Sequence, residues 1–215
     1  MSWSVEFRNV TCADLLQGFS AQIQTGCSAL IVTPREDGCN LLVRLITGLS
    51  HPSTGSVHVA GEDVASLALA QAYRLRRRIG VVPQKGGLVS NLKLWENMTL
   101  PLLYTHGSVS TEAEEMALRY LDLFGYHGNI MAMPAHVTLH DKRMAAFIRA
   151  ALCTPQIMVY DNCFEGLPAA GRTRWGAITT EFHRGSPDMT SIYLATSPDM
   201  AGEVAVDTVI SLPGR

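Results

Sequence analysis

The apolar and polar positions of the chain form short runs that are typical of strands and longer amphipathic stretches that are typical of helices. Residues 4–10 and 16–23 are predicted to be strands, and the second of them alternates apolar with polar positions. Short, nearly continuous apolar runs predict buried strands at residues 29–32 and 79–84 and further strands at residues 156–161, 190–196 and 206–212. Because helical patterns separate most of these strands, we expect a mainly parallel α/β sheet.

Helical patterns fill most of the remaining sequence. They predict helices at residues 40–49, 71–78 and 169–184 and a longer helical stretch at about 91–150, with breaks at Gly107, Gly125, Gly128 and Pro134. Between the first two helices, residues 55–64 predict a strand, a glycine turn and a short edge strand. The long helical stretch lies between strands, so it is a candidate sub-domain.

Composition favours one globular domain with a real core. The chain has 215 residues, of which 47% are hydrophobic and 17% charged. We expect a single domain over residues 1–215, with a core at 1–87 and 151–215 and a helical sub-domain at about 88–150. A formal net charge of −2 does not favour nucleic acid as the main partner.

The cysteines and the apolar runs bear on the cellular setting. Five cysteines, an odd number without a C-x-x-C pair, indicate reduced thiols of a cytosolic protein rather than a disulfide framework. The chain begins with no secretory signal pattern, and no apolar run approaches the ~18 residues of a membrane-spanning helix.

The segment after residues 29–32 has the layout of a phosphate-binding loop. A strand, a loop and the apolar start of a helix follow one another there, but the loop reads TPREDGCN. Such loops use glycines to bring backbone N–H groups onto phosphate, a lysine to neutralise its charge and a serine or threonine to hold Mg²⁺. This loop keeps only Gly38, and Cys39 and Asn40 follow it. Glu36 and Asp37 add negative charge where a polyphosphate would lie.

Several segments, in the correct order, resemble the ATP-binding subunit of an ABC transporter over about residues 3–212. They are GCSALIV, LVRLITGLSHPSTGSVHVAGEDV, RRRIGVVPQ, LWENMTLPLL and RAALCTPQIMVYD. The resemblance implies a P-loop NTPase-like α/β core with a mainly parallel sheet, an antiparallel edge sheet and a helical sub-domain. The segment ENMTLPLL also resembles the corresponding segment of the lipid-trafficking branch of this family, whose members work with Mce-type proteins. This resemblance would imply lipid transport.

The resemblance also assigns positions in the nucleotide site. Gly38 takes the last glycine position of the phosphate loop, Cys39 the lysine position and Asn40 the serine position. Loss of that lysine removes a charge-assisted contact of about 1.5–3 kcal/mol. Gln84 matches the glutamine of the Q-loop, and Asp161 matches the aspartate that ends Walker B.

The other nucleotide-site positions depart from the family pattern. In VTLHD, Thr138 keeps a hydroxyl at the signature sequence, but Leu139 and His140 replace its glycines. Asn162 stands where the family has its general-base glutamate, and an amide cannot accept a proton from water. Ser197 stands at the switch histidine. We therefore expect no cofactor, with ATP and Mg²⁺ bound only if binding is unconventional.

Simpler interpretations stay open for several of these residues. Asp161 could cap the next loop rather than hold metal, and Gln84 could be an ordinary loop residue. His136 and His140 have helical spacing, but the acid that metalloproteases place beside the first histidine is missing, so we expect no metal site. The arginines at 74, 76, 77 and 78 are interpreted mainly as a solvated face, with contact to lipid headgroups as the alternative.

The sequence thus predicts a degenerate ATP-binding subunit, a pseudo-ATPase, that serves as structural or regulatory partner of a membrane permease. It would be cytoplasmic and peripheral on the inner face of the cell membrane. It would form a homodimer or pair with another ATP-binding subunit. The groove that receives the permease corresponds to about residues 84–98, with Gln84, Leu88 and Trp95 as docking residues. The alternatives are a weak, unconventional ATPase and a soluble module that binds a different ligand.

Overall fold

Two sheets form the scaffold of this computed structural model, which describes residues 2–212. Residues 1 and 213–215 of the predicted single domain lie outside the described residues. The parallel sheet has the order β6-β7-β8-β3-β9, with β3 (Ser28–Val32), β6 (Ile79–Val82), β7 (Ile157–Asp161), β8 (Thr190–Ala195) and β9 (Thr208–Ser211). The antiparallel sheet has the order β2-β1-β4-β5, with β1 (Trp3–Cys12), β2 (Leu16–Gln24), β4 (Thr54–Val59) and β5 (Glu62–Asp63). The predicted fold class is therefore confirmed.

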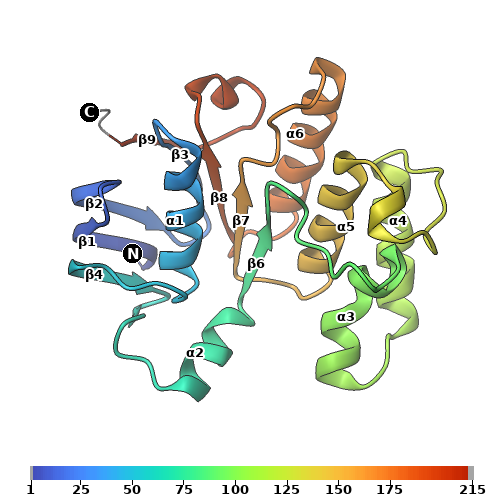
Figure 1. The fold of residues 1–215 in the computed structure, drawn as a ribbon, viewed down its shortest axis with the longest axis horizontal. Coiled ribbons are helices and arrows are strands. Elements are labelled where there is room, and N and C mark those ends of the chain that lie inside the picture. The colour runs from blue at the N-terminus through green and yellow to red at the C-terminus, as the bar shows by residue number, and fades with distance from the viewer. Residues whose placement is uncertain (1, 213–215) are drawn as a thin grey trace.

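Six α-helices accompany these sheets in the described part of the chain. They are α1 (Glu36–Ile46), α2 (Leu69–Arg76), α3 (Leu94–His106), α4 (Thr111–Leu123), α5 (Leu139–Ala151) and α6 (Ala169–Arg184). Two 3₁₀ turns are also present in this part of the chain. The turn η1 (Pro134–His136) precedes α5, and the turn η2 (Pro198–Gly202) follows β8. Figure 1 shows α1 beside the antiparallel sheet, whereas α3, α4 and α5 gather at the other end of the molecule. Within residues 2–212, no helix has the length and apolar character needed to span a bilayer.

Two clusters of buried side chains hold these layers together. One surrounds α1 and joins the inner faces of both sheets, with Leu42 and Leu45 of the helix fully buried. The other surrounds α5, where Phe147 meets the rings of Tyr120 and Phe182 edge to face. α1 and α5 are thereby fixed on opposite sides of the strands that carry the predicted site.

The start of α1 differs from the prediction. The helix begins at Glu36, four residues before the expected Asn40, and Arg35 is its N-cap residue. Glu36 and Asp37 occupy the first turn, where carboxylates interact favourably with the helix dipole. The acidic residues that are unfavourable in a phosphate loop are therefore favourable as the beginning of a helix.

The arginine run is only partly a solvated face. Arg76 donates hydrogen bonds of 3.0 and 2.9 Å to the carbonyl oxygens of residues 47 and 48, just after α1. Arg78 donates one of 2.6 Å to the side chain of Gln156 and pairs with Glu62 at 3.4 Å. Only Arg74 and Arg77 are exposed. The prediction of a solvated face holds for these two. Arg76 departs from it by fastening α2 to the end of α1. The Arg78 side chain is 37% exposed and stays partly solvated beside its two partners.

Candidate phosphate-loop site

The carboxyl ends of neighbouring parallel strands collect most of the predicted site residues. The loop into α1 follows β3, Gln84 follows β6, and Asp161 ends β7 beside Leu194 of β8. A cavity of about 650 Å³ opens between them. Its lining consists of Arg35, Glu36, Asp37, Asn40, Pro83, Gln84, Lys85 and Asp161. The structure thus brings Asn40, Gln84 and Asp161 together at one cavity.

The loop before α1 is closed by its own polar groups. The Thr33 hydroxyl donates a hydrogen bond of 2.6 Å to the carbonyl oxygen of Arg35, and the backbone N–H of Gly38 donates one of 3.1 Å to the same oxygen. The Arg35 side chain turns onto Asp37, with 3.0 Å between Nε and Oδ1. An anion at this helix start would therefore meet two carboxylates and an arginine that is already paired.

Gly38 and Cys39 are packed inside rather than presented to the cavity. Cys39 is 0% exposed, and its Sγ lies 3.3 Å from the Thr33 hydroxyl. Burial raises the pKa of this thiol to about 11. A Cβ atom added to Gly38 would lie 3.1 Å from Cβ of Thr33. The one glycine that this loop retains is therefore explained by close packing against Thr33.

Asp161 is a buried carboxyl group at the end of β7. Burial is the main cause that raises its pKa, and the nearby charge of Glu36 raises it further. A hydrogen bond from the backbone of Gln84 and the charge of Arg143 act in the opposite direction. The group therefore holds its proton more tightly than an ordinary aspartate.

Gln84 and Asn162 are both bound to Glu165, a residue that the sequence did not point to. The Gln84 amide donates to Oε2 of Glu165 at 2.8 Å, and the Asn162 amide donates to the same oxygen. Asn162 adopts a positive φ of 45°, a region that asparagine tolerates better than most residues. One carboxylate therefore ties the loop after β6 to the loop after β7.

Arg143 of α5 reinforces this connection. Its side chain is 2% exposed, and its Nε donates a hydrogen bond of 2.6 Å to the carbonyl oxygen of Gln84. Its Nη1 donates to the carbonyl oxygens of Cys163 and Glu165 at 3.0 and 2.6 Å. Burial lowers the pKa of this guanidinium, but nearby anionic groups oppose the shift. In the sequence, Arg143 directly precedes the apolar run 144–148, and a charged residue beside such a run is the one signal that could have indicated a buried arginine.

The hydroxyl groups of Thr138 and Ser197 cap helices. Thr138 is the N-cap of α5, where it accepts a hydrogen bond of 3.2 Å from the backbone N–H of Asp141 and donates one of 2.8 Å to that residue's carboxylate. Ser197 caps η2 through Asp199 in the same way, at 3.2 and 2.9 Å. Neither residue lines the 650 Å³ cavity. These two predicted site residues are therefore engaged elsewhere.

The histidines with helical spacing lie on different elements. His136 ends the turn η1, and His140 lies in the first turn of α5, with the Thr138 cap between them. Over the described residues 2–212, no group of three histidine, cysteine or acidic side chains is placed to hold a metal ion. The i, i+4 geometry that the metal alternative required is therefore absent at these two histidines.

The predicted docking segment is half-buried and well supported. Leu88 and Trp95 are partly buried and pack against the α5 cluster. Asn97 is fully buried, and its side chain bonds the backbone N–H and carbonyl of Val89 at 2.7 and 3.0 Å. Arg149 donates a hydrogen bond of 3.1 Å to the carbonyl oxygen of Gly87. Side chains of α3 and α5 thus fix the course of this loop.

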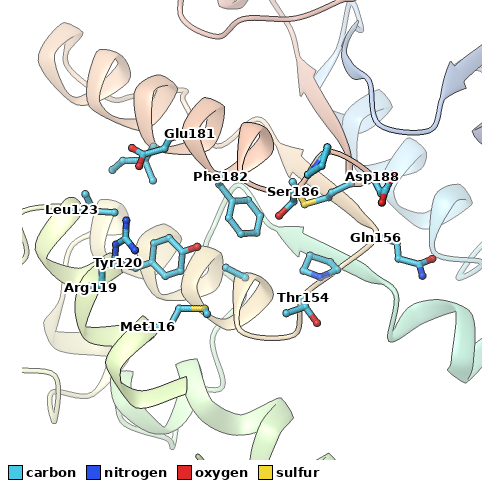
Figure 2. Close-up of a pocket in the computed structure, with 16 residues that line it drawn as sticks. Met116, Arg119, Tyr120, Leu123, Thr154, Gln156, Glu181, Phe182, Ser186 and Asp188 are labelled. Carbon is cyan, nitrogen blue, oxygen red and sulfur yellow. The ribbon is translucent and has the colours of Figure 1, made fainter. Parts of the chain in front are cut away.

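A second cavity, of about 590 Å³, lies away from the strands' carboxyl ends, between α4, α6 and the start of β7. Figure 2 shows Tyr120 and Phe182 next to each other in its middle, where their rings pack edge to face with 6.1 Å between centroids, with Arg119 and Glu181 toward one end and Gln156 and Asp188 toward the other. No local sequence signal predicts this cavity, because its lining comes from segments far apart along the chain.

Comparisons with known proteins identify the family of this chain. The sequence model of the family described as ABC transporter matches residues 16–165, more than half of the chain. The methionine import ATP-binding protein MetN of Caulobacter vibrioides is 30% identical over 152 residues, which cover 71% of this chain and 46% of MetN. The intermembrane phospholipid transport system ATP-binding protein MlaF of Haemophilus influenzae is 25% identical over 166 residues, which cover 75% of this chain and 63% of MlaF.

Solved structures show the same fold. The dimeric structure of MJ0796, a bacterial ABC transporter cassette, superposes with a TM-score of 0.84 at 20% identity, covering 97% of this chain and 94% of that one. The cbiO1 protein of Clostridium perfringens, part of the ABC transporter complex cbiONQ, gives a TM-score of 0.76 at 16% identity over 93% of this chain and 81% of cbiO1. The chain spans about half the length of the curated relatives it matches. The family match and the fold place the chain in the ABC transporter family, as an ATP-binding (nucleotide-binding) domain.

Proposed function

We propose that this chain is a degenerate ATP-binding domain that does not hydrolyse ATP and that acts as a structural or regulatory partner of a membrane permease. The observation that carries this proposal is the start of α1. Glu36 and Asp37 lie where phosphate would bind, and Cys39 is buried against Thr33 at the position that the family fills with lysine. Such a site lacks the lysine that contacts the β- and γ-phosphates in this family and places two carboxylates there instead.

The second half of the site supports the same proposal. Asn162 cannot act as a general base, and its amide is held by Glu165. In the family, each ATP site combines the phosphate loop of one chain with the signature sequence of its partner. At the start of α5, the side chains of Thr138 and Asp141 form a hydrogen bond with each other. A signature sequence would instead present free N–H groups to the partner's nucleotide at this place. The proposal therefore favours a homodimer, or a complex in which another pair of subunits hydrolyses ATP.

The docking segment supports a continuing role beside a permease. Leu88, on a loop that Asn97 and Arg149 hold in place, and Trp95, in the first turn of α3, present partly exposed apolar surface. A preorganised loop loses little conformational entropy on binding, which favours its use as an interface. The proposed location is the inner face of the cell membrane. MetN and MlaF are named for methionine import and phospholipid transport, so lipid is one proposed substrate class within this function.

One experiment separates this proposal from a weak, unconventional ATPase. The weak-ATPase interpretation is favoured by the cavity of about 650 Å³, which Arg35, Lys85 and Gln84 line together with Asp161. Phosphate release from ATP is measured for the purified chain and, for comparison, for the variant Asp161→Asn. The proposal predicts background release from both proteins. Release that is clearly above background and that the variant abolishes would establish the weak ATPase instead.

A further inference from the structure

The charges of the chain are unevenly distributed along its sequence. Residues 64–111 contain four arginines and two lysines but a single carboxylate, Glu96, although the whole chain has a formal net charge of −2. Arg76 and Arg78 serve internal contacts. Arg74 and Arg77 are exposed, and neither forms an ion pair with the described residues. Their charges are therefore available to an external partner.

Exposed apolar and aromatic side chains accompany these charges. Leu69 and Tyr73 lie four residues apart, hence on one face of α2, and are 68% and 58% exposed. Figure 1 shows α2 and the C-terminal end of α3 along the same edge of the molecule, at the bottom of the view. A cavity of about 430 Å³ joins the two helices, and its lining, which includes Leu102 and His106, contains no carboxylate.

We propose that this surface, made of Leu69, Tyr73, Arg74, Arg77 and His106 and called the α2–α3 face, binds the anionic headgroups of a lipid bilayer. Arginines near an anionic leaflet are attracted to it electrostatically. Tyrosine and leucine side chains enter the boundary between headgroups and acyl chains. Nucleic acid would use the arginines but would leave Leu69 in water, so the mixed character of the face favours a membrane.

The contact needs no permease, so the isolated full chain tests it independently of the proposed function. The purified chain is floated with phosphatidylcholine vesicles prepared with and without phosphatidylglycerol. We expect it to float only with the anionic vesicles, and less as salt is added, because salt screens the attraction. Arg74→Glu combined with Arg77→Glu should weaken binding by about tenfold or more. Both side chains are exposed, so thermal melting should show a folded variant.

The matched control reverses two other exposed arginines, with Arg119→Glu on α4 and Arg184→Glu on α6. It changes the net charge equally and should leave vesicle binding unchanged. If the double variant Arg74→Glu, Arg77→Glu fails to fold, the double variant Arg74→Gln, Arg77→Gln replaces it and should also weaken vesicle binding. Equal flotation with neutral vesicles, an equal loss in the control, or binding to RNA without binding to vesicles would each overturn the proposal.

Discussion

The side-chain amide of Gln84 donates a hydrogen bond of 2.8 Å to the carboxylate of Glu165, across 81 positions of sequence. The amide of Asn162 reaches the same carboxylate oxygen, and Arg143 bonds the backbone on both sides of the contact. The loops after β6 and β7 are therefore fastened to each other and to α5 by the chain's own side chains. Two residues that the sequence assigned to the nucleotide site, Gln84 and Asn162, serve this connection.

The first prediction concerns Arg143. Its replacement by alanine removes the donor from three carbonyl oxygens, at residues 84, 163 and 165, and the contact at residue 163 is buried. We expect Arg143→Ala to lower the free energy of unfolding by about 3 kcal/mol or more. Urea denaturation measures the loss. Arg119→Ala, which removes an exposed arginine, should change stability by less than about 0.5 kcal/mol. Similar small losses in both variants would show that the Arg143 contacts add little.

The second prediction concerns the Cys39 thiol. Burial raises its pKa from an ordinary 9.0 to about 11. In the unfolded chain the thiol releases its proton at lower pH than in the folded chain. Its contribution to stability is therefore complete below pH 9 and is lost as the pH rises to about 11. Between these two pH values, the free energy of unfolding should fall further in the unaltered protein than in Cys39→Ala. The difference between the two decreases should be on the order of 2 kcal/mol. Urea denaturation at several pH values measures this, and parallel curves would contradict it.

The fold was predictable because its signals are local. Alternating and continuous apolar runs identified the strands, and the order of helices and strands followed from them. The start of α1 was misplaced because Glu36 and Asp37 were interpreted as parts of a loop, although acidic residues also suit the first turn of a helix.

The contacts of the site were less predictable. Arg143 and its partners at Gln84 and Glu165 lie far apart in sequence, so only the folded chain brings them together. Gly38 illustrates a related difficulty, since a glycine retained for packing against Thr33 and one retained for phosphate binding look the same in a sequence.

A third prediction concerns restoration of the site. Cys39→Lys, Asn40→Ser and Asn162→Glu together restore three residue types that the family uses. We expect no phosphate release above background, because Glu36 still opposes phosphate and Leu139 still replaces a signature glycine. Thermal melting should accompany the assay, since a lysine at position 39 enters a buried position. Robust release from the folded triple variant would show that the signature region works despite its sequence.

A fourth prediction concerns permease docking. Leu88→Asp places a charge on the proposed interface and should weaken assembly with the permease by about tenfold or more, through loss of apolar burial. Co-purification with the tagged permease measures this. Leu118→Asp, on an exposed leucine of α4, is the matched control and should assemble normally. Assembly that is undiminished in a folded Leu88→Asp variant would move the docking surface away from residues 84–98.

The central claim is that the phosphate loop no longer holds ATP, and calorimetric titration of the purified chain with ATP-Mg tests it most directly. Glu36 and Asp37 at the helix start, together with the buried Cys39, predict no saturable binding below millimolar concentrations. A dissociation constant near about 10 μM, which corresponds to roughly −7 kcal/mol, would contradict the account.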